Sequence, residues 1–202
     1  MANTTATPLL MTDPGFLFAA PLGTALPAAG VGGTVAGSVF TDAWPVAWVN
    51  LGATEDGSEF SFSTTVEPIK VAEIFNPVQY SVTDQATSMS FTLASWTANN
   101  LRRAFNVGAG NLTTVSGASA TLLSKLTPPT PSQIIRTMVG WESLDATTRL
   151  FGYQVINGGE IKTAFKRAPD NATIPFQLNF EVPISPTVPF DVFVAGVGRL
   201  GV

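Results

Sequence analysis

The chain has 202 residues, enough for one domain with a core, and 12% of them are charged, against about 25% in ordinary soluble domains. It has neither cysteine nor histidine, which excludes disulfides and thiol nucleophiles and removes the commonest general base and the commonest transition-metal ligand. Apolar residues make up 45% of the chain, yet every apolar run ends well short of the ~18–20 residues of a membrane-spanning helix. We therefore expect the apolar surface to be buried against other copies of the protein.

The net charge of −4 hides two blocks of opposite sign. Residues 41–85 hold seven acids and one lysine, whereas residues 86–136 hold four bases and no acid. A subunit would show this segregation if an acidic surface of one copy met a basic surface of the next. The predicted inter-subunit residues are Arg102, Arg103, Lys125, Glu55 and Asp56.

The N-terminal part, residues 1–43, is rich in Ala, Gly, Pro and Thr and has no stable hydrophobic period. It predicts an extended arm, with plain disorder as the alternative, and its first residues lack the features of a signal peptide. A β-rich domain follows over residues 44–202. After a short strand from Trp48, Asp56-Gly57 predicts a turn, and "PIKVAEIF" and "PVQYSVT" predict further short strands.

The stretch "ATSMSFTLASWTANNLRRAF" predicts a half-buried strand followed by one short helix. Its strand alternates the apolar residues Met89, Phe91 and Leu93 with the polar residues Ser88, Ser90 and Thr92. Thr97 fits an N-cap, and the residues after it place Leu101, Ala104 and Phe105 on one face. We expect this helix to cover an open end or flank of a sheet.

The remainder of the chain predicts a long loop and then strands. Residues 106–132 are rich in Gly, Ser, Thr and Pro and predict an excursion outside the core. Asn157-Gly158 fits a type I′ hairpin turn, and "TIPFQLNFEV" alternates apolar residues with Gln177, Asn179 and Glu181. The predicted fold is an antiparallel β-sandwich or barrel with one flanking α-helix.

No pattern of catalytic, metal-binding or cofactor-binding residues emerges. Glu55, Asp56 and Glu59 lack the ligand spacing of a calcium loop, and "GVGGTVAG" lacks the strand and helix of a dinucleotide-binding motif. The four tryptophans could form a sugar-binding platform, although core and interface packing is the preferred interpretation. We predict a protein that is not an enzyme and needs no cofactor.

The order of these elements over residues 44–183 resembles the major tail tube proteins of long-tailed, non-contractile bacteriophages of the siphovirus type. The positions that carry the resemblance are Trp48, Leu51-Gly52, Thr54, Asp56-Gly57, Phe60, Pro77-Val78, Phe91, Leu93, Thr97 and Asn100-Leu101. The chain departs from that pattern at Ala94-Ser95, where relatives tend to carry an acid.

The resemblance implies a structural virion protein, made in the host cytoplasm, whose hexameric rings stack into a tail tube. It implies that inner sheets join into a barrel around a lumen, through which genomic DNA passes during ejection. The implied partners are further copies of the chain and other tail proteins, such as the tape measure, terminator and distal tail proteins. Residues 106–132 and the N-terminal arm are the expected ring-stacking elements.

The lumen of such a tube should lack bases, because each Lys or Arg that pairs with a phosphate adds affinity for DNA. The candidate lumen-facing residues are Glu59, Ser61, Ser63, Thr65, Glu67, Ser88, Ser90, Thr92, Gln177, Asn179 and Glu181. The pattern does not decide which of the three strands faces inward. The alternatives are a capsid decoration protein, a tail terminator, or a carbohydrate-binding sandwich module.

Overall fold

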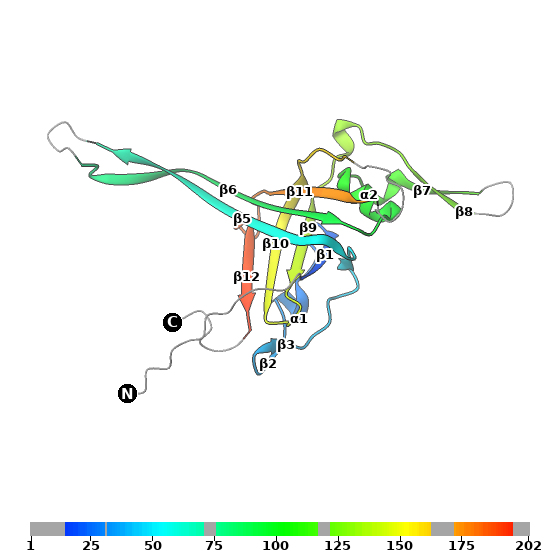
Figure 1. Ribbon diagram of the computed structural model, residues 1–202, viewed down its shortest axis with the longest axis horizontal. Coiled ribbons are helices and arrows are strands. Elements are labelled where there is room, and N and C mark those ends of the chain that lie inside the picture. Colours follow the sequence, from blue (N-terminus) through cyan, green and yellow to red (C-terminus); the bar gives the residue numbers. More distant parts are fainter. Residues whose placement is uncertain (1–14, 31, 71–75, 117–121, 163–171, 196–202) are drawn as a thin grey trace.

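The computed structural model describes residues 15–30, 32–70, 76–116, 122–162 and 172–195, and these residues form a mainly β fold (Figure 1). One antiparallel sheet contains β1 (Phe16–Pro21), β4 (Val49–Asn50), β5 (Thr54–Ile69), β6 (Gln79–Leu93), β9 (Thr137–Glu142), β10 (Thr148–Asn157), β11 (Ile174–Phe180) and β12 (Phe190–Val194). Two small sheets pair β2 (Val35–Ala36) with β3 (Val39–Phe40) and β7 (Leu112–Ser116) with β8 (Leu122–Leu126). The helices are α1 (Pro27–Gly30), α2 (Ala98–Ala104) and the 3₁₀ turns Ala109–Asn111 and Pro131–Gln133.

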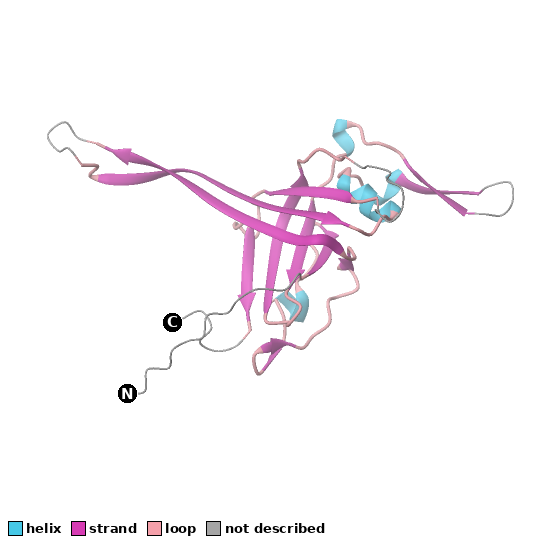
Figure 2. Cartoon of the chain, in the orientation of Figure 1, coloured by secondary structure: helices cyan, strands magenta, loops and turns pink. Residues whose placement is uncertain are grey.

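The eight-stranded sheet is open and bends over itself. Its order is β4-β1-β9-β10-β11-β6-β5, and β12 pairs with β10 beside β11. In Figures 1 and 2, β5, β6 and β11 run across the direction of β9, β10 and β12. The predicted antiparallel β fold with one flanking helix is confirmed, whereas the described residues form no closed barrel.

The main core lies between β1, β9 and β10 on one side and β6 and β11 on the other. The predicted alternation supplies it, because Met89, Phe91 and Leu93 of β6 are buried as expected. The buried residues of β11 that pack with them are Ile174, Phe176 and Leu178. Burying these side chains removes apolar surface of β11 and of the second half of β6 from water and provides the main stabilisation of this part of the fold.

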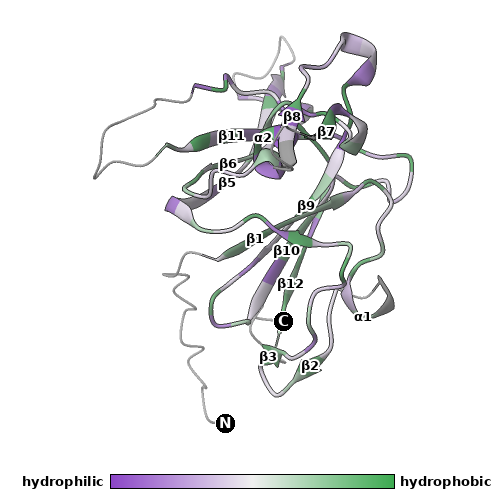
Figure 3. Cartoon of the chain, turned by 90° about the vertical axis from the view of Figure 1, so that its right-hand side faces the viewer, coloured by the Kyte–Doolittle hydropathy of each residue, from purple (hydrophilic) through white to green (hydrophobic). Residues whose placement is uncertain are grey.

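A second buried cluster lies on the opposite side of β1, β9 and β10. It contains Ala20, Leu26, Trp48, Met138 and Phe151. Successive residues of a strand point to opposite faces, so both faces of these strands are covered. Apolar residues accordingly predominate along β1, as Figure 3 shows.

Thr97 caps α2, and two asparagines, Asn100 and Asn157, join the helix to neighbouring segments. The hydroxyl of Thr97 accepts from the backbone N–H of Asn100 at 3.1 Å, which confirms the predicted N-cap. The side chain of Asn100 donates to the carbonyls of Leu51 at 2.8 Å and Ser95 at 3.0 Å. Asn157 donates to the carbonyl of Ala104 at 2.9 Å, which fixes the other end of the helix.

Two predicted turns are wrong. Asp56-Gly57 lies inside β5, where the pairing with β6 shifts register and Gly57 takes a φ of +85°. A glycine in this conformation accommodates a bulge without ending the strand. Asn157-Gly158 is not a two-residue hairpin turn either, because β10 ends at Asn157 and its antiparallel partner β11 begins only at Ile174. The side chain of Asn157 instead binds α2 and β11.

Three predicted segment boundaries also change. "PVQYSVT" and "ATSMSFTL" belong to one strand, β6, and the predicted loop over 106–132 contains the hairpin of β7 and β8. Of the predicted N-terminal arm, residues 1–14 lie outside the described residues, and Phe16–Pro21 forms β1 between β4 and β9. Pairing on both sides orders this short segment, although its sequence lacks a strand period.

β5 and β6 extend well beyond the body as a two-stranded hairpin (Figure 1). We call residues 61–69 and 79–86 the β5–β6 arm. Every residue of this arm is exposed, whichever way its side chain points. The hairpin of β7 and β8 projects from the opposite side of the body, beside α2 (Figure 1).

Candidate functional site

The three strands predicted to carry polar sides lie next to one another, in the order β11, β6, β5. The strand register places Glu59, Ser90 and Gln177 in one row and Ser61, Ser88 and Asn179 in the next. Directly opposed residues of antiparallel strands share a face of the sheet. These six side chains therefore form one continuous surface, which we call the polar face.

Five of the six residues of the polar face are exposed and Ser88 is half-buried, whereas the other side of the same strands packs into the core. Phe60, Met89 and Leu178 form the neighbouring row, in which Met89 and Leu178 are buried and Phe60 is half-buried. The six residues of the polar face include one acid, Glu59, and no lysine or arginine. Ser63 and Glu67 continue the same side of β5 along the arm.

Thr92 lies at the end of the polar face near the bulge of β5. It opposes Pro175 of β11 and is half-buried. A shallow hollow of about 290 Å³ opens here, lined by Asp56, Glu59 and Ser90 among others. The described residues contain no group of three or more His, Cys, Asp or Glu side chains placed to hold a metal ion.

Glu181 lies one residue beyond β11 and belongs to a different environment. Its carboxylate accepts from Nε of Arg136 at 2.9 Å and from Nε2 of Gln154 at 2.6 Å. These two hydrogen bonds hold the pKa of Glu181 below its usual value, with the former the larger cause. Glu181 thus links the segment before β9 to β10, and its charge is neutralised within the chain.

The predicted basic residues lie on neighbouring elements. Arg102 and Arg103 are half-buried on α2, and Lys125 is exposed on β8, which packs against α2. Arg102 donates from Nη1 to the carbonyl of Val107 at 2.8 Å. Nε of Arg102 and Nη1 of Arg103 are buried and have no acceptor among the described residues.

Burial, followed by the positive charge of Arg102, lowers the pKa of Arg103 to about 10. Glu55 and Asp56 are exposed at the bulge of β5. Within the described part of the chain, no ion pair joins these two acids to Arg102, Arg103 or Lys125. The predicted contact of these residues between copies is not tested by a single chain, and it stays a prediction.

Sequence reasoning missed a buried arginine that joins three parts of the fold. Arg149 is 1% exposed, and its Nε donates to Glu142 at 2.6 Å. Nη1 donates to the Asp42 carboxylate at 3.0 Å and the Gly32 carbonyl at 3.1 Å, and Nη2 donates to the Asp42 carbonyl at 2.8 Å. The available signal was an arginine within the otherwise largely apolar strand "TRLFGYQVIN".

Two of the four tryptophans are engaged inside the fold. Trp44 stacks on Phe18 with ring centroids 4.1 Å apart and donates to Glu142 at 2.6 Å. Trp48 is buried, and its indole nitrogen donates to the carbonyl of Ala25 at 3.0 Å. These contacts match the preferred core interpretation and leave neither ring available to stack on a sugar.

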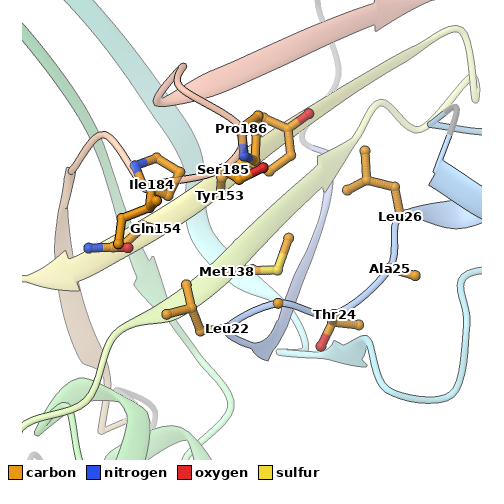
Figure 4. A pocket seen from close by; sticks show the side chains of 12 residues that line it. Leu22, Thr24, Ala25, Leu26, Met138, Tyr153, Gln154, Ile184, Ser185 and Pro186 are labelled. Atoms are coloured by element: carbon orange, nitrogen blue, oxygen red, sulfur yellow. The ribbon is translucent and has the colours of Figure 1, made fainter.

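A cavity of about 650 Å³ lies between the loop after β1, strands β9 and β10, and the loop after β11 (Figure 4). Its lining is mainly apolar and includes Leu22, Met138 and Ile184, and none of the lining residues carries a charge. The Tyr153 hydroxyl donates to Asp191, and burial and this hydrogen bond raise the pKa of Tyr153.

No model of a known protein family matches the sequence, and no curated protein matches it significantly. Among the described residues, no helix combines the length and the apolar character needed to cross a bilayer. The geometry described above defines the candidate site. It consists of the polar face, the β5–β6 arm, and Arg102 and Arg103 of α2, which form no ion pair within the described residues.

Proposed function

We propose that this protein is a structural subunit of a bacteriophage tail tube, in which rings of copies stack into a conduit for genomic DNA. The observation that carries the proposal is the polar face. Three strands, each predicted separately to carry a base-free polar side, lie side by side and present those sides on one exposed surface. In the proposed assembly this surface lines the lumen.

The electrostatics of the polar face suit a conduit. Duplex DNA carries one phosphate charge per ~1.7 Å, and lysine or arginine side chains would bind it in a salt-dependent way. The polar face offers hydroxyls, amides and the Glu59 carboxylate, which solvate the lumen without holding phosphates. DNA would therefore pass along such a surface without specific binding.

The sheet also has an edge that invites pairing with another copy. β5 has 16 residues and one partner, β6, within the described chain. A long unpaired edge exposes backbone N–H and C=O groups, and joining edges between subunits satisfies them. We infer that the bent open sheet of each subunit becomes part of one continuous barrel in the ring, as in a sandwich subunit of the tail tube type.

Exposed apolar residues of the arm support burial against further protein. Phe62, Val66, Val82 and Tyr80 are 50%, 49%, 56% and 60% exposed. The pairing of Val66 with Val82 and of Pro68 with Tyr80 places them on the side of the arm opposite Glu67. In a free monomer this apolar stripe would face water. Soluble monomers rarely expose a continuous apolar surface, so the stripe favours burial against another protein.

The test is electron microscopy of the purified full chain, combined with sedimentation velocity over a range of protein concentrations. We expect rings and stacked tubes with a central channel. A protein that stays monomeric at high concentration would overturn the proposal. Trimers or single rings that never stack would instead favour a capsid decoration protein or a tail terminator.

A further inference from the structure

Unpaired charges of opposite sign are segregated onto different elements. β5 and β6 hold five acids, namely Glu55, Asp56, Glu59, Glu67 and Asp84, and no base, although Lys70 follows directly after β5. α2, β7 and β8 hold three bases and no acid, namely Arg102, Arg103 and Lys125. None of these eight residues takes part in an ion pair within the described residues.

The two arginines of α2 do not have all their hydrogen-bond acceptors in a single chain. Nε of Arg102 and Nη1 of Arg103 are buried without an acceptor. Burying part of a guanidinium without an acceptor is unfavourable. Both residues are only half-buried, so a carboxylate of a second chain can pair with their accessible part and offset the charge, without reaching the two buried atoms. The segment 86–136 contains no carboxylate that could serve.

The acids of the β5–β6 arm cannot reach α2 of the same chain. The arm leaves the body on one side, and α2 with the hairpin of β7 and β8 lies on the opposite side (Figure 1). Asp84 opposes Thr65 in the arm, and Glu67 lies two residues further along the same side of β5. The arm therefore carries two neighbouring carboxylates on one side, away from every base of α2.

We propose that Arg102 and Arg103 of one copy receive the carboxylates Glu67 and Asp84 from the β5–β6 arm of a second copy. This inference rests on the proposed homo-oligomeric function and names the contact that joins the subunits. Because each copy uses different surfaces for its two neighbours, the association is head to tail, as in a ring or a continuing stack. Glu67 then belongs to a contact between subunits, and the lumen is lined by the six residues of the polar face.

Charge reversal on each side gives a sharp test. One variant carries Arg102→Glu with Arg103→Glu, and the other carries Glu67→Lys with Asp84→Lys. Each variant alone sets like charges against each other at every contact, so we expect its assembled fraction to fall about tenfold or more. In an equimolar mixture every contact between unlike variants regains opposite charges, and we expect alternating co-assemblies.

The readouts are sedimentation velocity and electron microscopy on the full chain, with circular dichroism to establish that each variant is folded. Lys162→Glu is the matched control, since Lys162 is 80% exposed and paired with Glu160. It should assemble like the wild type. Co-assembly in the mixture also shows that both variants are folded, because only correctly folded chains can form the contact.

The outcomes separate this inference from the proposed function. If the wild type forms tubes and the reversed variants also do so alone, the contact is wrong and the tube proposal stands. If the folded variants fail alone and also fail when mixed, this pairing of residues is equally refuted. If the wild type never assembles, both proposals fall together. Should a reversed variant not fold, Arg103→Gln and Glu67→Gln provide milder changes, and unchanged assembly in both would also refute the contact.

Discussion

Replacing Arg149 by methionine tests whether the buried ion-pair network holds the fold together. Methionine retains much of the apolar stem, so the change removes chiefly the four hydrogen bonds to Glu142, Asp42 and Gly32. Removing one partner of a buried ion pair costs about 3–5 kcal/mol, because the remaining charges lose their compensation. Glu142 and Asp42 keep 15% and 19% side-chain exposure, which places the expected loss near the lower value, at about 3 kcal/mol.

The measurement is equilibrium urea unfolding followed by tryptophan fluorescence, with all variants at one protein concentration because assembly also stabilises the folded state. Trp44 reports on the network directly, since its indole donates to Glu142. Lys162→Met is the control, because the exposed pair with Glu160 should contribute less than about 0.5 kcal/mol. A loss below about 1 kcal/mol for Arg149→Met would show that this reasoning about the network is wrong.

Three further changes test other parts of the molecule. Asn157→Ala removes hydrogen bonds that join α2 to β10 and β11, and we expect a loss of about 2 kcal/mol in urea unfolding; an unchanged midpoint would contradict this. In the Glu181→Gln variant the free energy of unfolding should depend less steeply on pH in the acid range. Because Arg136 lowers the folded pKa of Glu181 below 4.5, its contribution is present above that pH and is lost as the pH falls through the folded value. The free energy of unfolding measured between about pH 7 and about pH 3 should therefore fall more steeply in the wild type than in the variant. Ser90→Lys should leave stability within about 0.5 kcal/mol but give assembled protein a salt-dependent affinity for duplex DNA. Filter binding checks it, with Ser132→Lys as the control outside the polar face, and equal binding by both would refute a lumen role for Ser90.

Local patterns predicted the parts of the fold that depend on neighbouring residues. The strict alternation in "IPFQLNF" and "SMSFTL" identified which side of β11 and β6 is buried, because each strand has one covered face. Thr97 was identifiable as an N-cap because its role depends only on the helix that follows. The polar face follows from the same alternation, although only the register of the strands shows that its three parts are adjacent.

Features that depend on distant partners escaped prediction. Phe16–Pro21 is a strand because β4 and β9 pair with it, and both of its faces are covered, so no period of two marks it. Gly57 signals a turn in isolation but forms a bulge because β6 continues alongside. The partners of Arg149 lie up to 117 residues away in the chain, so no local motif indicates its hydrogen-bond network.

The exposed arm has a consequence for how association can be observed. Apart from the contact of Phe62 with Phe190, the two-stranded arm is exposed in the lone chain, so its amide protons should exchange with deuterium early. A neighbour seated against the arm would slow that exchange, while the already covered strands β9 and β10 would change little. Residues 61–69 and 79–86 therefore report on association. Slower amide exchange in these residues alone would show, without any added label, that a second molecule is bound there.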